Sequence, residues 1–207
     1  MPPHGTLPGP FVTLSHDDHA LSANTGLECA MTVRPIRYLG DPVLRHPSKK
    51  VSRVDDSIRR LIADMTESMV EAQGVGIAAS QIGIGLRIVV IGMPNEEPFP
   101  LINPEVIKRS GERRLDEGCL SVPGYRGVVT RSEFVTVKAL DANGREIRVK
   151  AENDLLAQAL EHEVDHVNGT LYVDRVDSDD DLVKLQPGDP TLAEEREAAA
   201  AEQTRGS

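Results

Sequence analysis

The sequence predicts an α+β fold in a single domain, with mostly antiparallel strands packed around a central helix and a further helix near the domain's N-terminal end. Apolar residues recur at helical spacing over residues 55–73. Residues 134–140 and 146–149 alternate as strands around Asp141-Ala142-Asn143-Gly144, a sequence typical of a hairpin turn. A second apolar stripe, over residues 155–167, predicts the central helix.

Composition limits the class of protein. The chain has 207 residues, 39% of them hydrophobic and 27% charged, as in an ordinary globular domain. Aromatic residues make up only 3% and Trp is absent, so the core must be mainly aliphatic. The net charge of -10 argues against a nucleic-acid backbone as a direct partner.

Cysteine usage and the N-terminal composition indicate the cellular compartment. Cys29 and Cys119 are too few for a disulfide framework, which favours a reducing environment. No apolar run approaches the roughly 18 residues of a membrane span. Residues 1–30 contain no Lys or Arg, unlike a secretory signal or a transit peptide. We therefore expect a cytoplasmic protein without membrane contacts.

The chain divides into three parts. Residues 1–30 are rich in Pro, Gly, Ser and Thr and predict a disordered leader, in which three histidines are either loose metal ligands or solvated residues (His4, His16 and His19). Residues 31–176 form the expected folded domain. Residues 177–207 are an acidic, Ala- and Glu-rich tail with weak helical character and too little apolar surface for a core.

The remaining elements follow in order. After the first helix, residues 74–81 are mostly small; they are either a structural turn or a loop that offers backbone groups and the Gln81 amide to a ligand. Residues 86–91 predict a buried strand and residues 99–102 a shorter one. Residues 171–173 predict a short extended piece.

The central helix carries the residues with the clearest chemistry. His162 and His166 are four positions apart, so both rings can point from one helix face at one ion. Glu163 lies about 100° round the helix, where it can reach a water on that ion. Asn153 or Asp154 can cap the helix start, and Gly169 suits the turn after its end. The alternative is a surface helix that carries these residues by chance.

One cysteine stands apart from this helix in an unusual setting. Cys119 stands in Glu117-Gly118-Cys119-Leu120-Ser121, where its neighbours are poor core residues. A single cysteine is more often a small core residue than a ligand, and Cys119 departs from that expectation because Glu117, Gly118 and Ser121 are poor core residues.

These motifs together resemble peptide deformylase, the bacterial metal enzyme that removes the formyl group from the initiator methionine of nascent polypeptides and releases formate. The three blocks are Gly74–Gln81, Glu117–Ser121 and His162–His166, in the family's order. Agreement at Gly40–Arg45 extends the resemblance over residues 31–176. The family usually has Gln where this chain has Glu161, outside the metal triad.

The resemblance implies a metal centre and a mechanism. Cys119, His162 and His166 would hold one divalent ion, typically Fe²⁺, with Zn²⁺, Ni²⁺ or Co²⁺ also able to occupy the site. Metal-bound water would attack the formyl carbon. Glu163 would take its proton and later protonate the departing amine. The Gln81 amide and the Leu120 backbone N–H would stabilise the oxyanion.

The resemblance also implies substrate contacts. The backbone at Gly76 would hold the formamide, and Val75 would pair with the peptide as an added strand. Arg126 is expected to face the peptide. N-formylmethionyl nascent peptides would be the partners, with the ribosome near the peptide exit as a further one, although the negative charge indicates no RNA-facing surface.

Supporting side chains and rival functions remain open. Glu117 and Arg131 are candidates for a bracing pair. Asp165 either orients a ligand or braces the helix, or it forms a plain salt bridge. A zinc metallopeptidase would share the two histidines and the glutamate but would need Asp174 or Asp177 as its third ligand. A homologue without catalysis is the other alternative, and it conflicts with the complete motifs.

Overall fold

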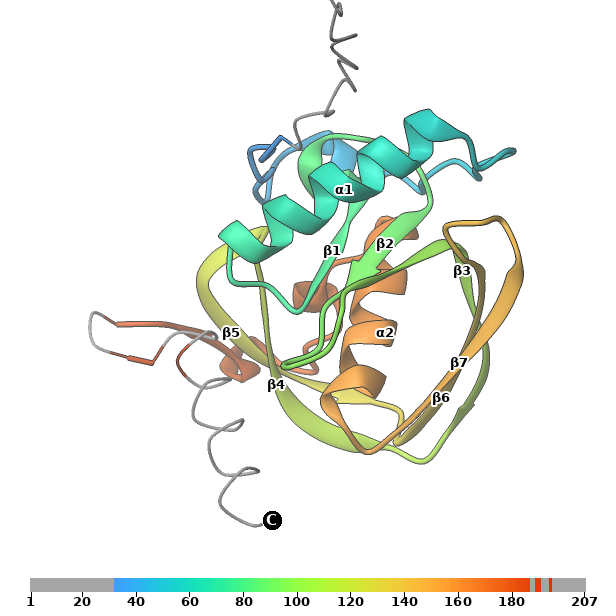
Figure 1. Cartoon of the computed structure of the whole chain (residues 1–207). Coiled ribbons are helices and arrows are strands. Elements are labelled where there is room, and N and C mark those ends of the chain that lie inside the picture. Colours follow the sequence, from blue (N-terminus) through green and yellow to red (C-terminus); the bar gives the residue numbers. More distant parts are fainter. Residues whose placement is uncertain (1–31, 187–188, 191–193, 195–207) are drawn as a thin grey trace, which may run out of the picture.

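The computed structural model describes residues 32–186, 189–190 and 194. The predicted leader, with its three histidines and Cys29, lies outside the described residues, as does most of the predicted tail. Figure 1 shows the helix α2 (Leu155–Val167) enclosed by strands, with the helix α1 (Asp56–Glu71) across one end of the domain. The predicted α+β fold is confirmed.

Two antiparallel sheets surround α2. The larger has the order β1-β2-β3-β6-β7 and the smaller the order β4-β5-β8. The strands of the larger sheet are β1 (Gly76–Ala78), β2 (Ile88–Ile91), β3 (Phe99–Ser110), β6 (Phe134–Leu140) and β7 (Glu146–Glu152). Those of the smaller are β4 (Arg113–Cys119), β5 (Val122–Arg131) and β8 (Leu182–Lys184). Short 3-10 turns are η1 (Pro42–Arg45), η2 (Ala79–Ile82), η3 (Tyr172–Asp174) and η4 (Asp179–Asp181).

The predicted first helix is confirmed as α1. Asp55 caps it, because its carboxylate accepts hydrogen bonds from the backbone N–H groups of Ser57 (3.0 Å) and Ile58 (3.2 Å). Its methionines are core residues, since Met65 and Met69 are almost fully buried against the five-stranded sheet. The helix therefore supports the sheet from the side opposite α2.

Strand β2 is apolar at every position because it is covered on both faces. Val89 and Ile91 pack in the core cluster that contains α2. Ile88 and Val90, which point the other way, pack in the cluster that contains α1. The continuous apolar run in the sequence is the signature of this double burial.

Both ends of α2 follow the sequence prediction. Asp154 accepts a hydrogen bond from the Ala157 N–H at 2.7 Å and so caps the N-terminus. Gly169 has a φ of +79° after the helix end. A Cβ at Gly169 would lie 2.7 Å from the Arg45 carbonyl oxygen, so the close approach also requires glycine. These two residues fix the length of the helix that carries the histidines.

Some elements differ from prediction. The extended piece expected at residues 171–173 is wrong: Tyr172–Asp174 forms a 3-10 turn, in which the Asp174 side chain accepts from the Leu171 N–H at 2.8 Å. Strands β1, β4, β5 and β8 are not predicted, and β3 continues well past residue 102. Although β8 follows residue 176, the division of the chain there stays a prediction. No helix in the described part is long and apolar enough to cross a membrane.

Candidate active site

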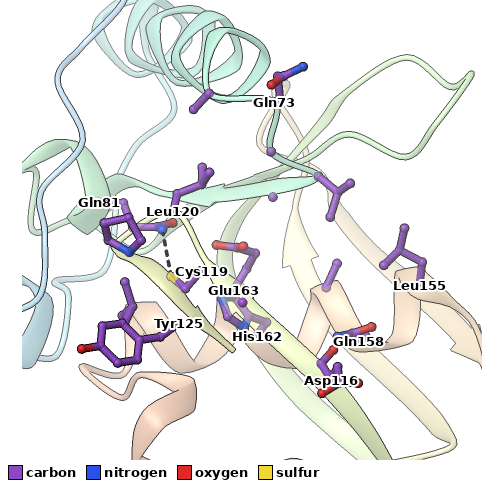
Figure 2. A pocket seen from close by; sticks show the side chains of 18 of the residues that line it. Gln73, Gln81, Asp116, Cys119, Leu120, Tyr125, Leu155, Gln158, His162 and Glu163 are labelled. Carbon is purple, nitrogen blue, oxygen red and sulfur yellow. Dashed lines mark hydrogen bonds between the residues drawn. The ribbon is translucent and has the colours of Figure 1, made fainter. Parts of the chain in front are cut away.

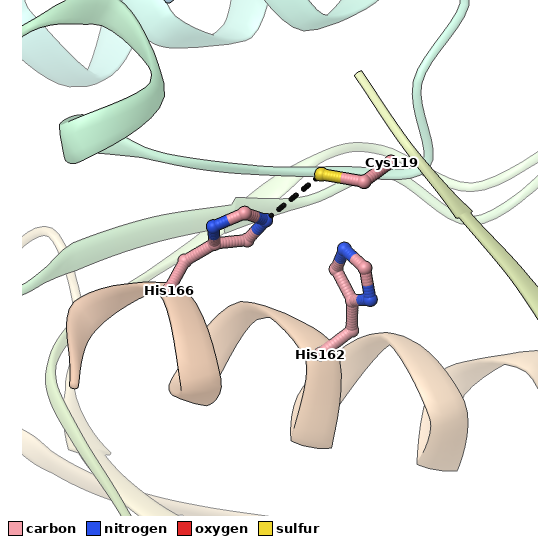
Figure 3. Close-up of side chains that lie close together, drawn as sticks. All are labelled: Cys119, His162 and His166. Atoms are coloured by element: carbon pink, nitrogen blue, oxygen red, sulfur yellow. Dashed lines mark hydrogen bonds between the residues drawn. The ribbon is translucent and has the colours of Figure 1, made fainter. Parts of the chain in front are cut away.

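Three potential metal ligands meet where β4 ends against α2. Figure 3 shows Cys119 facing the rings of His162 and His166, which project from successive turns of α2. One ligand atom from each lies within 4.8 Å of the others. The Cys119 Sγ and the His166 Nε2 are 3.2 Å apart. Glu117 and Ser121, two positions away on either side, are polar, yet Cys119 is buried, with 6% of the residue exposed.

This donor set fits a divalent metal ion. A thiolate and two imidazole nitrogens are the ligands of a catalytic site that keeps a fourth position open. Among the described residues, these three form the group able to hold an ion. Asp174 is outside it, because its carboxylate is paired with Arg45 and with the Leu171 N–H. The structure therefore brings together the sulfur and the two rings rather than the peptidase-type set.

Local backbone geometry explains how Cys119 reaches the helix. The β4–β5 pairing has a register shift between Glu117 and Cys119, which turns the strand end inward. The Ser121 N–H points at the sulfur at 3.4 Å. The Gln81 Nε2 points at it at 3.6 Å. Both donors contact the sulfur atom that would bind a metal.

A buried carboxylate orients the first histidine. The His162 Nδ1–H donates to the Glu117 Oε2 at 2.8 Å, which leaves the Nε2 for an ion. Arg131 holds the same carboxylate with two hydrogen bonds, from Nε at 2.7 Å and from Nη2 at 2.9 Å. Both Glu117 and Arg131 are almost fully buried, so each charge requires the other. The predicted bracing pair is confirmed.

Arg131 also joins the sulfur-bearing hairpin to the histidine helix. Its Nη1 donates to the Asp165 Oδ2 at 2.6 Å, and Asp165 lies on α2 between the two histidines. Arg175 pairs with the same aspartate from the outer side. Because Asp165 is buried, this contact is more than a surface salt bridge. It fixes the position of β5, and hence of β4, relative to α2.

Charges in this cluster shift the ionisation of its members. Burial acts to raise the pKa of Glu117, but the charge on His162 and the hydrogen bonds from Arg131 outweigh it and lower the pKa to about 2. Burial alone would lower the pKa of His162, yet the Glu117 carboxylate raises it well above its ordinary value. Burial and the positive charge of His162 lower the pKa of His166. These opposite shifts favour a proton on His162 over one on His166.

Glu163 lies beside the metal ligands and beneath β1. It is 4% exposed and points toward the cavity in Figure 2. A Cβ built on Gly76 would lie 2.4 Å from the Glu163 Oε1. Any side chain at Gly76 would therefore displace the carboxylate. This contact explains one glycine of the small-residue segment.

Gln81 is held from both ends of its amide. Its Oε1 accepts from the Ala78 N–H at 2.7 Å, and its Nε2 approaches the Ser121 Oγ at 3.2 Å. The N–H groups are thus directed at the sulfur end of the site (Figure 2). Leu120, next to Cys119, completes this side. The segment contains strand β1 and the turn η2 that carries Gln81, and its role toward a ligand stays a prediction.

A cavity of about 460 Å³ opens over these groups. We call it the central cavity; of the predicted site residues, it is lined by Val75, Gly76, Gln81, Cys119, Leu120, His162 and Glu163. Arg126 does not line it, and its Nη2 donates to the Pro190 carbonyl at 3.0 Å. Its neighbour Tyr125 does line the cavity. Because adjacent residues of a strand point to opposite faces, Arg126 points away from the cavity.

Sequence reasoning missed several wall residues. Leu155, Gln158 and Ala159 of α2 line the central cavity. These residues lie three, four and seven positions before His162, a spacing that puts them on the same face of α2 as that ligand. The sequence therefore contains a signal for this wall. For Tyr125 and Leu185, which also line the cavity, no local pattern indicated a role.

Comparisons with known proteins agree with this geometry. A family described as polypeptide deformylase matches residues 33–181. A peptide deformylase from Dehalococcoides mccartyi is 48% identical over 168 residues, which cover 81% of this chain and 100% of that protein. Peptide deformylase 1 from Clostridium acetobutylicum is 49% identical over 146 residues, 70% of this chain and 96% of that protein.

Solved structures show the same fold. The peptide deformylase from Synechococcus elongatus, in complex with actinonin, has a TM-score of 0.69 and 43% identity, covering 73% of this chain and 83% of that one. Members of this family are metal-dependent hydrolases, and Cys119, His162 and His166 form a possible metal site here. The chain belongs to the peptide deformylase family, whose members remove the N-formyl group from nascent peptides.

Proposed function

We propose that the deformylation reaction takes place in the central cavity on one divalent ion held by Cys119, His162 and His166. The observation that carries this proposal is the convergence of their ligand atoms within 4.8 Å. A bound divalent ion lowers the pKa of a water and polarises the formyl oxygen. We propose Fe²⁺, as the resemblance implies, although Zn²⁺, Ni²⁺ and Co²⁺ suit the same donors.

Glu163 is the proposed proton carrier. Its carboxylate is buried beside the ligands and accepts a proton from the attacking water. The water oxygen bonds to the formyl carbon, and the bond from that carbon to nitrogen then breaks. Glu163 returns the proton to the departing amine, so the products are formate and a peptide with a free amino terminus.

Gln81 and Leu120 are the proposed oxyanion donors. The hydrogen bond from the Ala78 N–H fixes the Gln81 oxygen and directs the amide N–H groups toward the reacting carbon. The backbone N–H of Leu120 lies in the turn directly after Cys119. Donors held in place before the reaction stabilise developing charge without reorganisation.

The peptide is proposed to bind along the free edge of β1. This strand is the end strand of its sheet, so Val75 and Gly76 can pair with an added strand. The apolar wall of Leu155 and Ala159 suits the methionine side chain. A peptide deformylase from Acinetobacter baumannii, 33% identical with a TM-score of 0.68, has been solved with Met-Ala-Ser bound. A contact between Arg126 and the peptide stays a prediction.

The proposed place of action follows from the substrate. Formylated amino termini arise during translation, so we propose that the enzyme works in the cytoplasm near the peptide exit of the ribosome. Its role in protein biosynthesis is then to free the initiator methionine for later processing.

Formate release from formyl-Met-Ala by anaerobically purified protein tests the proposal. We expect turnover that a chelator abolishes and added Fe²⁺ restores. Acetyl-Met-Ala is the matched control, since it differs by one methyl group at the reacting carbon. Absence of formate from the metal-loaded protein would contradict the proposed function.

A further inference from the structure

The central cavity has an end wall that the reaction itself does not use. In Figure 2, Leu155 and Gln158 lie at one end of the cavity and Tyr125 at the other, with Cys119 and Glu163 between them. Leu185 is attached at the Tyr125 end, because its N–H donates to the Gly124 carbonyl at 2.9 Å. Leu185 also lines the cavity.

Leu185 comes from a part of the chain beyond the match to the family, which ends at residue 181. Strand β8 carries it to the cavity by pairing with β5, with Lys184 opposite Tyr125 and Leu182 opposite Gly127. Leu182 packs against the core cluster that contains Cys119. The wall is therefore built by pairing and packing within the domain.

Two further contacts hold this segment in place. The Arg114 Nη2 pairs with the Asp181 Oδ1 at 2.9 Å, just before β8. The Arg126 guanidinium donates to the Pro190 carbonyl, just after it. Leu185 is half-buried, so its side chain is covered on one side and faces the cavity on the other.

We infer that Leu185 and Tyr125 form a subsite for the side chain of the residue that follows the initiator methionine, with a preference for apolar side chains. This inference rests on the proposed binding of the peptide in the central cavity. With the formyl carbon at the ligands and the methionine against Leu155 and Ala159, the next residue can reach the opposite end of the cavity, which Tyr125 and Leu185 line. Leu185 is thus a specificity-determining residue that this chain supplies from outside the matched region.

Four variants of the full-length enzyme test the inference with formyl-Met-Leu-Ser and formyl-Met-Asp-Ser. Leu185→Ala removes apolar contact, and we expect the KM for the Leu peptide to rise about three- to tenfold with kcat unchanged. Leu185→Lys places a cation at the wall, and we expect the kcat/KM ratio of Leu to Asp peptide to fall about tenfold or more.

Val183→Ala and Val183→Lys are the matched controls. Val183 lies on β8, two residues before Leu185, is 55% exposed and does not line the cavity. We expect both to leave KM and the substrate ratio within about twofold of wild type. The inference would be overturned if Leu185→Lys and Val183→Lys changed the kcat/KM ratio of the two peptides equally. An unchanged KM for the Leu peptide in Leu185→Ala would also overturn it. Wild-type turnover distinguishes failure of the subsite from failure of the proposed function. If the wild type releases formate but the Leu185 variants keep its KM and substrate ratio, only the subsite is rejected. If the wild type releases no formate, the proposed function is rejected.

Discussion

Gly76 and Glu163 are in contact across the gap between β1 and α2, so closely that a Cβ on Gly76 would lie 2.4 Å from the Glu163 Oε1 and 2.8 Å from its Cγ. The atoms that would clash belong to a flexible side chain. A methyl group can therefore be accommodated by moving the carboxylate, without unfolding the sheet. Gly76→Ala therefore displaces the Glu163 carboxylate without removing it from the protein.

Gly76→Ala should lower kcat/KM by about a hundredfold or more, since a displaced proton carrier loses its geometry with respect to the reacting water. Metal content should be unchanged. Gly85→Ala is the control, because a Cβ at Gly85 would meet nothing within 4 Å. Full activity in Gly76→Ala, measured by formate release, would contradict the proposed position of Glu163.

Glu163→Ala should retain bound metal and lose about 10²- to 10⁴-fold in kcat, as expected for removal of a general acid–base group. The double variant with Gly76→Ala should be no slower than Glu163→Ala alone, since both changes remove the same contribution. Additive losses in this cycle would show that Gly76 acts independently of Glu163.

Glu117→Gln should weaken metal binding by about 10- to 100-fold, because His162 loses the carboxylate that orients its ring and Arg131 loses its main partner. Competition with a fluorescent chelator measures the change. Glu112→Gln, at an exposed position on the loop before β4, should bind metal as the wild type does. If Glu117→Gln bound metal with wild-type affinity, Glu117 would not be needed to orient His162.

Metal binding should release protons near neutral pH, because His162 and Cys119 both bind an ion in their deprotonated forms. In the metal-free protein the pKa of His162 is raised well above 6.5 by Glu117, so its ring is protonated at pH 7, whereas ligation needs the neutral ring. Affinity should therefore rise as pH increases and fall as it decreases. Calorimetric titration of Zn²⁺ in two buffers of different ionisation enthalpy counts the protons. Equal heats in both buffers would contradict this assignment.

The parts of the site that depend on local periodicity could be predicted from the sequence. Helical spacing placed His162 and His166 on one face, and the capping residue Asp154 and the turn glycine Gly169 marked the ends of α2. Cys119 could be linked to them only through the resemblance, because its approach depends on the register shift in β4. Periodicity carries no information about pairing across more than forty residues.

Other features depend on tertiary structure alone. Strand β1 is three residues long and β8 equally short, so neither has a period to detect. Leu171, Tyr172 and Val173 have high β-propensity and so predict an extended piece, but the Asp174 side chain closes a 3-10 turn instead. Leu185 acquires its place at the cavity only through the pairing of β8 with β5.

The central claim is that one sulfur and two imidazole nitrogens hold the ion. X-ray absorption spectroscopy of the Zn²⁺-loaded protein tests it most directly. We predict one sulfur at about 2.3 Å and nitrogen or oxygen neighbours at about 2.0 Å, with the sulfur lost in Cys119→Ala and retained in Asp174→Ala. A coordination shell without sulfur in the wild-type protein would contradict the account.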